Sequence, residues 1–496
     1  MNHDRSQLIA EIRATGTIAG LPSGHFIDGR LVPPAAGRTI DSFDPGRGRP
    51  FASFAAGDAE DVQRAVDAAR RAFKSWGRSK PAERGRILQL AAALLRERAA
   101  QFAVVESLDS GKRLVEAEGD VAGVVRAFEY YAGAADKLHG DSIPLGPDYV
   151  GLTVEEPVGI AAQIIPWNYP ISTAARGIAP ALAAGCTIVA KPAEQTPFTA
   201  LMLAQLLSEA GLPDGVLNVV TGTGADAGAP LVANPGIDHI TFTGSVPTGI
   251  RVMHAAADNV TRLVLELGGK SPLAVFADCD LDSAIEGILG AIYENAGQIC
   301  SAGSRLIVER SIAAEVTQRL AERVSAMRIG HGLDDVDIGP VNSAVQLASI
   351  ARRVDAAKAA GNTVIAGGAI IPPDQVGGGW FYQPTIIAAQ SVSDPLVQEE
   401  IFGPVLTVQQ VDDLDDAIAA ANATRYALVA GIYTRDLSKA WRFAREIDAG
   451  QVYINEYFAG GIEVPFGGNK KSGFGREKGM NALRSYCKLK SIVARI

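Results

Sequence analysis

The chain has 496 residues, 47% apolar and 20% charged, a balance typical of globular proteins with large cores and a length sufficient for about three domains of ~150 residues. Its net charge of −9 and pI of about 5.4 repel a polyanion, so we expect no nucleic-acid partner. Four cysteines without a CxxC pair argue against a disulfide scaffold, and the scattered histidines argue against a metal site. The lack of an apolar run of ~18 residues argues against a membrane span.

The N-terminal part of the chain is expected to form helical scaffold. The stretch from Met1 to Arg13 lacks the apolar core of a secretory signal, which together with the few cysteines favours a cytoplasmic protein. Asp58 is placed to cap a helix whose apolar residues, from Val62 to Phe73, recur on one face. A second, leucine-rich helix is expected to begin near Pro81.

From Tyr149 onward, short apolar segments alternate with helical patterns. We expect strands at 149–154, 159–165, 187–190, 217–220 and 239–242, with helices at 172–184 and 201–210. Such alternation predicts right-handed βαβ units in a parallel sheet, whose ligands bind at the carboxyl ends of the strands. The segments around Trp167, Lys191, Thr221 and Gly244 follow strand ends, so they are expected to line one crevice.

The second half repeats this alternation more loosely, which completes an α/β fold class. Strands are expected at 304–308, 405–411 and 429–433, and a long helix ends near Met327. The apolar stretch at 491–494 is expected to be a strand that adds to the edge of a neighbour's sheet.

Two short motifs carry candidate chemistry. Cys300 ends the run Asn295-Ala296-Gly297-Gln298-Ile299-Cys300, and Glu266 lies upstream in Leu265-Glu266-Leu267-Gly268-Gly269-Lys270. A thiolate beside small residues is open to attack a substrate, and a carboxylate can then activate water. Taken singly, however, a cysteine is more often a small buried hydrophobe and a glutamate a solvated surface group.

Further motifs favour the catalytic interpretation. Their order and spacing resemble the aldehyde dehydrogenase superfamily from about Phe26 to the C-terminus. They are Pro166-Trp167-Asn168-Tyr169-Pro170, Lys191-Pro192-Ala193-Glu194, Phe242-Thr243-Gly244-Ser245, Glu400-Ile401-Phe402-Gly403-Pro404 and Pro465-Phe466-Gly467-Gly468.

The resemblance implies an architecture with two larger domains and an arm. A Rossmann-like NAD-binding domain is expected from 1–138 and 158–267, and an α/β catalytic domain from 268–471. A small β oligomerisation arm is expected from 139–157 and 482–496, joining subunits into a homodimer or homotetramer.

The resemblance also implies the catalytic roles. Cys300 attacks a small-molecule aldehyde, and the side-chain amide of Asn168 with the backbone N–H of Cys300 stabilises the oxyanion. Hydride transfer to the nicotinamide leaves a thioester, which water activated by Glu266 hydrolyses to a carboxylic acid. Glu477, in the glycine-rich stretch 475–479, is expected to be structural.

The expected cofactor is NAD, with weaker use of NADP. The carboxylate of Glu194 is placed to bind the adenosine ribose with Lys191 and to repel a 2′-phosphate. Gly244 and Ser245 form either a simple helix cap or, as the resemblance favours, the pyrophosphate site. The GxGxx[GA] match at 222–227 is weak, and the resemblance puts that loop near the adenine end. The full set of cofactor residues is Ile164, Trp167, Lys191, Glu194, Gly224, Phe242, Gly244, Ser245, Glu400 and Phe402.

The substrate itself is not determined by the sequence. Candidate tunnel residues are Tyr169, Thr173, Arg176, Ile299, Ser301, Tyr457 and Phe458. Arg176 stands where many relatives place a large apolar residue, and Gly177 where a lysine is frequent. Arg176 therefore either binds a polar or acidic substrate tail or forms a salt bridge nearby.

Three functions remain open from the sequence. The leading one is NAD-dependent, hydrolytic aldehyde oxidation, which the retained Glu194, Glu400 and Phe402 favour. The alternative is an acyl-transferring or thioesterase-like enzyme that uses Cys300 without net redox. A non-catalytic protein that kept the fold is the third, and the retained Cys300 and Glu266 count against it.

Overall fold

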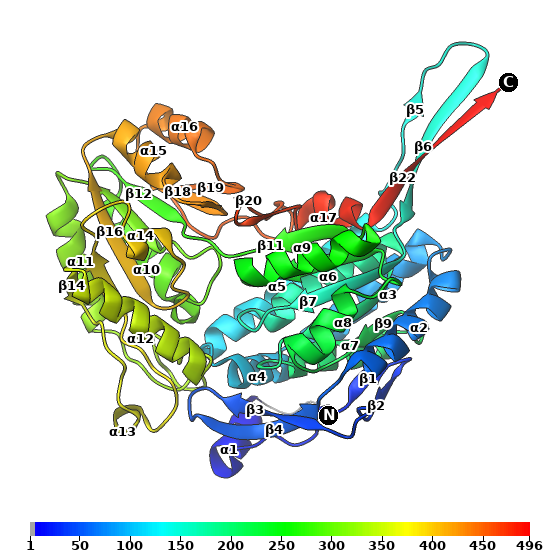
Figure 1. The fold of residues 1–496 in the computed structure, drawn as a ribbon, viewed down its shortest axis with the longest axis horizontal. Coiled ribbons are helices and arrows are strands. Elements are labelled where there is room, and N and C mark those ends of the chain that lie inside the picture. Colours follow the sequence, from blue (N-terminus) through cyan, green and yellow to red (C-terminus); the bar gives the residue numbers. More distant parts are fainter. Residues whose placement is uncertain (1–4) are drawn as a thin grey trace.

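The structure is a computed structural model that describes residues 5–496. Figure 1 shows two lobes, each built around a β-sheet, and a narrow β arm that projects from one of them. Residues 1–4 of the expected NAD-binding segment and of the stretch without a secretory signal lie outside the described residues.

The N-terminal segment wraps the larger lobe before it enters the sheet. Its elements are α1 (Arg5–Thr15), β1 (His25–Ile27), β2 (Arg30–Val32), β3 (Thr39–Asp44), β4 (Arg49–Ala55), α2 (Ala59–Trp76), α3 (Pro81–Glu97), α4 (Ala99–Ser110) and α5 (Leu114–Ala134). The expected cap is confirmed, because the Asp58 side chain accepts a hydrogen bond from the backbone N–H of Glu60.

The sheet of the larger lobe has eight strands in the order β2-β1-β9-β8-β7-β10-β11-β21. Its remaining strands are β7 (Ile160–Ile165), β8 (Thr187–Pro192), β9 (Leu217–Val219), β10 (His239–Thr243), β11 (Arg262–Glu266) and β21 (Gly473–Phe474). The five strands from β9 to β11 are mutually parallel, as the sequence predicted, so their carboxyl ends share one edge.

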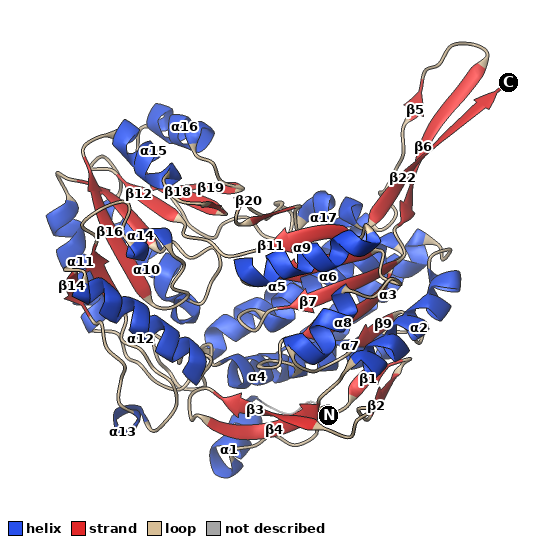
Figure 2. Cartoon of the chain, in the orientation of Figure 1, coloured by secondary structure: helices blue, strands red, loops and turns tan. Residues whose placement is uncertain are grey.

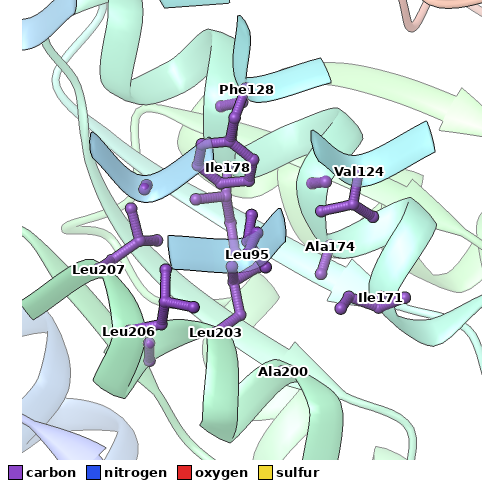
Figure 3. Packing of buried hydrophobic residues seen from close by; sticks show 14 of the residues in the cluster. Leu95, Val124, Phe128, Ile171, Ala174, Ile178, Ala200, Leu203, Leu206 and Leu207 are labelled. Atoms are coloured by element: carbon purple, nitrogen blue, oxygen red, sulfur yellow. The ribbon is translucent and has the colours of Figure 1, made fainter. Parts of the chain in front are cut away.

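Helices cover both faces of this sheet (Figure 2). They include α6 (Pro170–Ala184), α7 (Phe198–Glu209), α8 (Ala229–Val232), α9 (Val246–Asn259) and α17 (Gly479–Ser485). Figure 3 shows the core between α6, α7 and the layer of α3 to α5, where Leu95, Phe128, Ile178 and Leu203 interlock. Because α6 is buried on nearly every side, the residues at its N-terminus are held rigidly.

The smaller lobe contains a seven-stranded sheet in the order β14-β15-β16-β13-β12-β18-β19. Its strands are β12 (Pro272–Val275), β13 (Arg305–Glu309), β14 (Thr363–Ala366), β15 (Thr385–Ala388), β16 (Val405–Val411), β18 (Val429–Tyr433) and β19 (Gln451–Ile454), and a separate pair is formed by β17 (Tyr426–Ala427) and β20 (Asn469–Lys470). Its helices are α10 (Leu281–Tyr293), α11 (Ala313–Ser325), α12 (Ala344–Ala359), α13 (Pro373–Val376), α14 (Pro395–Gln398), α15 (Leu414–Asn422) and α16 (Leu437–Glu446). The expected strands near 304, 405 and 429 are confirmed.

The arm consists of β5 (Ser142–Ile143), β6 (Tyr149–Pro157) and the C-terminal β22 (Cys487–Arg495). β22 pairs antiparallel with β6 of its own chain, within the arm expected from 139–157 and 482–496, in a register that sets Ile492 opposite Leu152. Pairing of 491–494 with a neighbour's sheet stays a prediction. The long antiparallel β6 satisfies one edge of β22, while the other edge of β22 pairs with no strand among residues 5–496.

A search of the helices in the described residues finds none long and apolar enough to cross a membrane. The mixed α/β architecture with parallel sheets is the expected fold class.

Candidate active site

Cys300 follows a strained turn at the boundary of the two lobes. Asn295, Ala296 and Gly297 all have positive φ values, of 49°, 52° and 71°. Residues other than glycine rarely adopt positive φ values, so the surrounding contacts must stabilise this turn. The Asn295 backbone N–H donates to Glu116 at 3.0 Å, and its side-chain amide donates to the Asn168 carbonyl at 3.0 Å. The turn therefore presents Cys300 in a fixed position beside Asn168.

Asn168 lies in the loop between β7 and α6 and is buried. Its amide nitrogen donates one hydrogen bond to the Gln298 carbonyl at 2.9 Å. An amide nitrogen carries two N–H groups, so the second remains available to a substrate oxygen. In the part of the chain that the structure describes, the backbone N–H of Cys300 donates no hydrogen bond. Two donors of the expected oxyanion hole are thus free.

Glu266 is the last residue of β11 and is 2% exposed. Neither of its carboxylate oxygens has a hydrogen-bond partner among residues 5–496. Burial raises its pKa well above the ordinary range, and the nearby Glu477 carboxylate raises it further. A buried carboxylate without partners is poised to hold a proton taken from water.

Glycines bring the Glu266 segment against Cys300. A Cβ on Gly269 would lie 2.5 Å from the Cys300 carbonyl oxygen, which explains why this position has no side chain. Gly268 lies as tightly against the Glu400 carboxylate, whose Oε1 accepts a hydrogen bond from the Gly269 N–H at 2.9 Å. The backbone of Cys300 and the carboxylate of Glu400 therefore both lie against the two glycines that follow Glu266 and Leu267.

The Cys300 thiol is largely buried, and burial raises its pKa to about 12. The Glu400 carboxylate contributes in the same direction, whereas the positive charge of Arg176 lowers this pKa. The resting group is accordingly a thiol rather than a thiolate, and Arg176 is the cation that favours its ionisation.

The cofactor residues predicted on strands lie side by side at the sheet edge. In the parallel register Ile164 pairs with Lys191 on one side and with Phe242 on the other. The Lys191 ammonium group is buried, lies 3.6 Å from a Glu194 oxygen, and has its pKa lowered to about 8 by burial. Glu194 is partly exposed at the rim, so its carboxylate can reach two ribose hydroxyls.

Ser245 is the N-cap of α9, and its side chain makes no capping hydrogen bond with the helix amides. It bonds the Thr248 hydroxyl instead, at 3.0 Å, which leaves the first-turn N–H groups available to an anion. Gly224 opens a π-helical turn with open space around its Cα, at the end of the same crevice. These features fit a dinucleotide with its pyrophosphate on α9.

Phe402 and Trp167 stand at the nicotinamide end of the crevice. Their rings meet edge to face with centroids 5.3 Å apart. Glu400, two residues away, has its pKa raised to about 7 by burial. The pair forms an apolar wall that can hold a flat heterocycle near Cys300.

Most of the predicted tunnel residues belong to one apolar cluster. Ile299 and Tyr457 are buried in it, and Tyr169, Phe458 and Cys300 pack against it. The Tyr457 hydroxyl donates to the Ser301 carbonyl at 2.9 Å, so Ser301 contributes backbone to this wall. Thr173 is buried outside the cluster, on α6, and its carbonyl accepts a hydrogen bond from Gln163 at 2.7 Å.

Arg176 lies on α6 close to Glu477, with 4.0 Å between the nearest nitrogen and oxygen. The structure is therefore compatible with both possibilities left open by the sequence. Arg176 forms a long ion pair with Glu477, and its guanidinium keeps donors free for a polar or acidic substrate tail. Lys478 was not predicted from the sequence. Glu477, expected to be structural, is buried, and its charge raises the pKa of Glu266. Nor was Lys112 predicted, whose buried ammonium lies 4.1 Å from the centre of the Tyr169 ring.

A search for groups of His, Cys, Asp and Glu able to hold a metal ion finds none in residues 5–496.

Comparison with known proteins agrees with this geometry. The profile of the Aldehyde dehydrogenase family matches residues 32–492. A betaine aldehyde dehydrogenase from Rhizobium leguminosarum bv. trifolii is 43% identical over 473 residues, 95% of this chain and 96% of that protein. An aldehyde dehydrogenase from Aspergillus niger is 41% identical over 96% of this chain and 95% of its own. The crystal structure of betaine aldehyde dehydrogenase from Staphylococcus aureus in complex with NAD+ superposes with a TM-score of 0.95 at 38% identity, covering 99% of this chain and 97% of that one.

Proposed function

Since the chain belongs to the aldehyde dehydrogenase family and oxidises an aldehyde with NAD, we propose that Cys300, Glu266 and Asn168 carry this reaction. The observation that supports the assignment is that backbone contacts link the three residues. The Asn168 amide donates to the Gln298 carbonyl two residues before Cys300, and the Cys300 carbonyl packs against Gly269, three residues after Glu266, whose carboxylate is unpaired among residues 5–496. The redox reaction rather than acyl transfer is the activity of this family.

In the first step the Cys300 sulfur attacks the aldehyde carbon, and the thiol proton is released to solvent as the net proton of the reaction. The negative charge moves to the aldehyde oxygen, where the second N–H of Asn168 and the backbone N–H of Cys300 donate hydrogen bonds. Bound NAD supplies the acceptor for the hydride that leaves the resulting thiohemiacetal. The thioester on Cys300 remains.

In the second step Glu266 takes a proton from water, and the hydroxide attacks the thioester carbon. The C–S bond breaks, the acid leaves, and Cys300 recovers its proton. Burial raises the pKa of Glu266, which makes its carboxylate a stronger base than an exposed one.

The cofactor assignment places NAD along the carboxyl edge of the parallel sheet. Glu194 and Lys191 would hold the adenosine ribose, the α9 N-terminus at Ser245 the pyrophosphate, and Glu400 the nicotinamide ribose. A carboxylate at Glu194 repels the extra phosphate of NADP, so we propose that NADP is the weaker cofactor. The same geometry supports the domain division at 1–138 and 158–267, and at 268–471, proposed from the sequence.

Cys300→Ala separates binding from chemistry. We expect the variant to bind NAD in isothermal titration with the wild-type Kd, because the thiol holds no part of the nucleotide, and to produce no NADH from any aldehyde. Residual NADH production above a few per cent of the wild-type rate would remove Cys300 as the nucleophile.

Assembly into a homodimer or homotetramer through the arm is also part of this proposal. The arm exposes a run of large apolar side chains on β6 and β22, including Leu152, Leu489, Ile492 and Val493, beside an unpaired strand edge. Light scattering of Ile492→Lys, compared with the exposed Lys74→Met as a control, tests it: a wild-type mass for Ile492→Lys would refute assembly through this strand. A cytoplasmic location is proposed with it, in keeping with the four free cysteines among the described residues.

The betaine aldehyde dehydrogenases among the relatives raise an aldehyde with a quaternary ammonium group as a candidate substrate. The charges around the tunnel of this chain argue against it.

A further inference from the structure

Two cationic side chains flank the Phe466 ring next to the reacting thiol. The Arg176 guanidinium carbon lies 5.7 Å from the centre of this ring, and the Lys478 ammonium nitrogen lies 5.4 Å from it. Arg176 comes from α6, whereas Lys478 precedes α17, so the chain brings them together from segments about 300 residues apart. Phe466 itself is buried in the apolar cluster that contains the tunnel aromatics.

Neither cation has a hydrogen-bond acceptor among residues 5–496. The guanidinium offers five N–H groups and the ammonium three, yet neither group donates a hydrogen bond to the protein. The carboxylate of Glu477 is the acidic group beside Arg176, at 4.0 Å, and its own hydrogen bond is accepted from Thr243. The Arg176 side chain is 26% exposed, so a small molecule can reach part of it.

The two cations lie close to the site of the chemistry, because Cys300 packs against the cluster that contains Phe466. The charge of Arg176 lowers the pKa of the Cys300 thiol, and Lys478 in turn responds to the charges of Cys300 and Glu266. Burial and the neighbouring Arg176 lower the pKa of Lys478 to about 7, as expected for two cations held together without enough anions between them.

Arg176 and Lys478 are the two cations of this cluster, and Glu266 and Glu477 are its two buried carboxyl groups, whose pKa values burial raises. Arg176 stays charged at every physiological pH. A substrate with a fixed positive charge would be repelled here, and one with a negative charge would supply the missing acceptor.

We propose that the physiological substrate is an aldehyde with a carboxylate at its distal end, which Arg176 and Lys478 bind beside Phe466. The inference rests on the proposed function, because it assigns the tail of a substrate whose aldehyde carbon reacts with Cys300. Arg176 and Lys478 are specificity-determining residues in this arrangement, and a quaternary ammonium aldehyde is a poor substrate.

The test uses three aldehydes of equal chain length that differ only at the distal end. One carries a carboxylate, the second its methyl ester, and the third a trimethylammonium group. We expect kcat/KM for the carboxylate to exceed that for the ester by ~10- to 150-fold, the range of a charge-assisted hydrogen bond. The trimethylammonium aldehyde should rank last.

Variants locate the effect. Arg176→Leu and Lys478→Met should each lower the carboxylate-to-ester ratio of kcat/KM at least several-fold, whereas Arg176→Lys should retain part of this preference. Arg176→Glu should raise kcat/KM for the trimethylammonium aldehyde above that for the carboxylate. The exposed Lys74→Met removes a charge far from the tunnel and should leave the ratio unchanged. Because the ratio compares two substrates on one protein, a general loss of active enzyme does not alter it.

Two failures are distinguishable. If the wild type reduces NAD neither with any of the three aldehydes nor with any aldehyde of a wider panel, the proposed function fails. If it oxidises the ester or the trimethylammonium aldehyde as efficiently as the carboxylate, or if the ratio survives both Arg176→Leu and Lys478→Met, the activity stands and the substrate inference is wrong.

Discussion

Replacing Asn168 by alanine isolates the oxyanion hole. The side-chain amide has two N–H groups, one bonded to the Gln298 carbonyl at 2.9 Å and one directed to no acceptor in the described residues. The variant loses the second as a donor to the developing oxyanion, a loss that typically costs ~10²–10³ in rate, or about 2.7–4 kcal/mol. We therefore expect NADH formation in the first turnover to slow by that factor, with little change in NAD affinity.

The effect on stability should be much smaller. The Gln298 carbonyl keeps a long contact, 3.4 Å, from the Asn295 amide, so its acceptor is not left fully bare. Losing one neutral hydrogen bond costs about 0.5–1.5 kcal/mol. Asn362→Ala is a control in the other lobe. Asn362 is 6% exposed against 7% for Asn168, and its side chain bonds the Ala357 carbonyl, Asp394 and the Gln390 N–H, so the control tests whether a larger loss of hydrogen bonds far from the site affects the rate.

Stopped-flow absorbance of NADH under single-turnover conditions is the assay. Asn362→Ala should show at least as large a loss of stability in urea and a wild-type hydride-transfer rate. Asn168→Asp, which keeps the shape but removes both donors, should be at least as slow as Asn168→Ala. A first-turnover rate in Asn168→Ala within about threefold of wild type would refute the role of this amide.

Three further predictions follow from the same geometry. Glu266→Gln should give a burst of about one NADH per active site and then slow turnover, because deacylation lacks its base; unchanged steady-state turnover would exclude Glu266. Glu194→Gln should raise kcat/KM for NADP relative to NAD by removing the repulsion of the 2′-phosphate, and a wild type that already uses both equally would contradict this role. The rate of alkylation of Cys300 by iodoacetamide in the absence of NAD should rise with pH without a plateau below about pH 10, because the pKa of the thiol is raised to about 12. Arg176→Leu removes a cation that lowers this pKa, so it should slow alkylation at any fixed pH. An accelerated reaction would show that Arg176 does not lower the pKa of Cys300.

Local sequence determined most of the secondary structure and the identity of the reacting groups. Apolar segments of four to seven residues between turn residues predicted β7, β8, β10, β16 and β18, because a strand buried on both faces in a parallel sheet must be apolar throughout. The Asp58 cap was equally local, since it depends on residues two positions apart. Motif order alone pointed to Cys300, Glu266 and Asn168.

The environment of these groups was decided by tertiary structure. Burial of Cys300 and Glu266, which sets both pKa values, depends on how the two lobes meet and not on the flanking residues. The pairing of β22 with β6 was likewise decided by tertiary structure, because the two strands are more than 300 residues apart in the sequence.

The charge of the substrate tunnel is the clearest case. Arg176 on its helix was compatible with a salt bridge or with a ligand, and the sequence offered no way to choose between them. The fold sets it beside Lys478 and Phe466 with a single distant carboxylate, an arrangement made by residues about 300 positions apart. Electrostatic interactions fall off with distance in space, so the net charge that a substrate tail meets is a property of the folded neighbourhood, whereas the chemistry of a thiol or a carboxylate belongs to the residue itself.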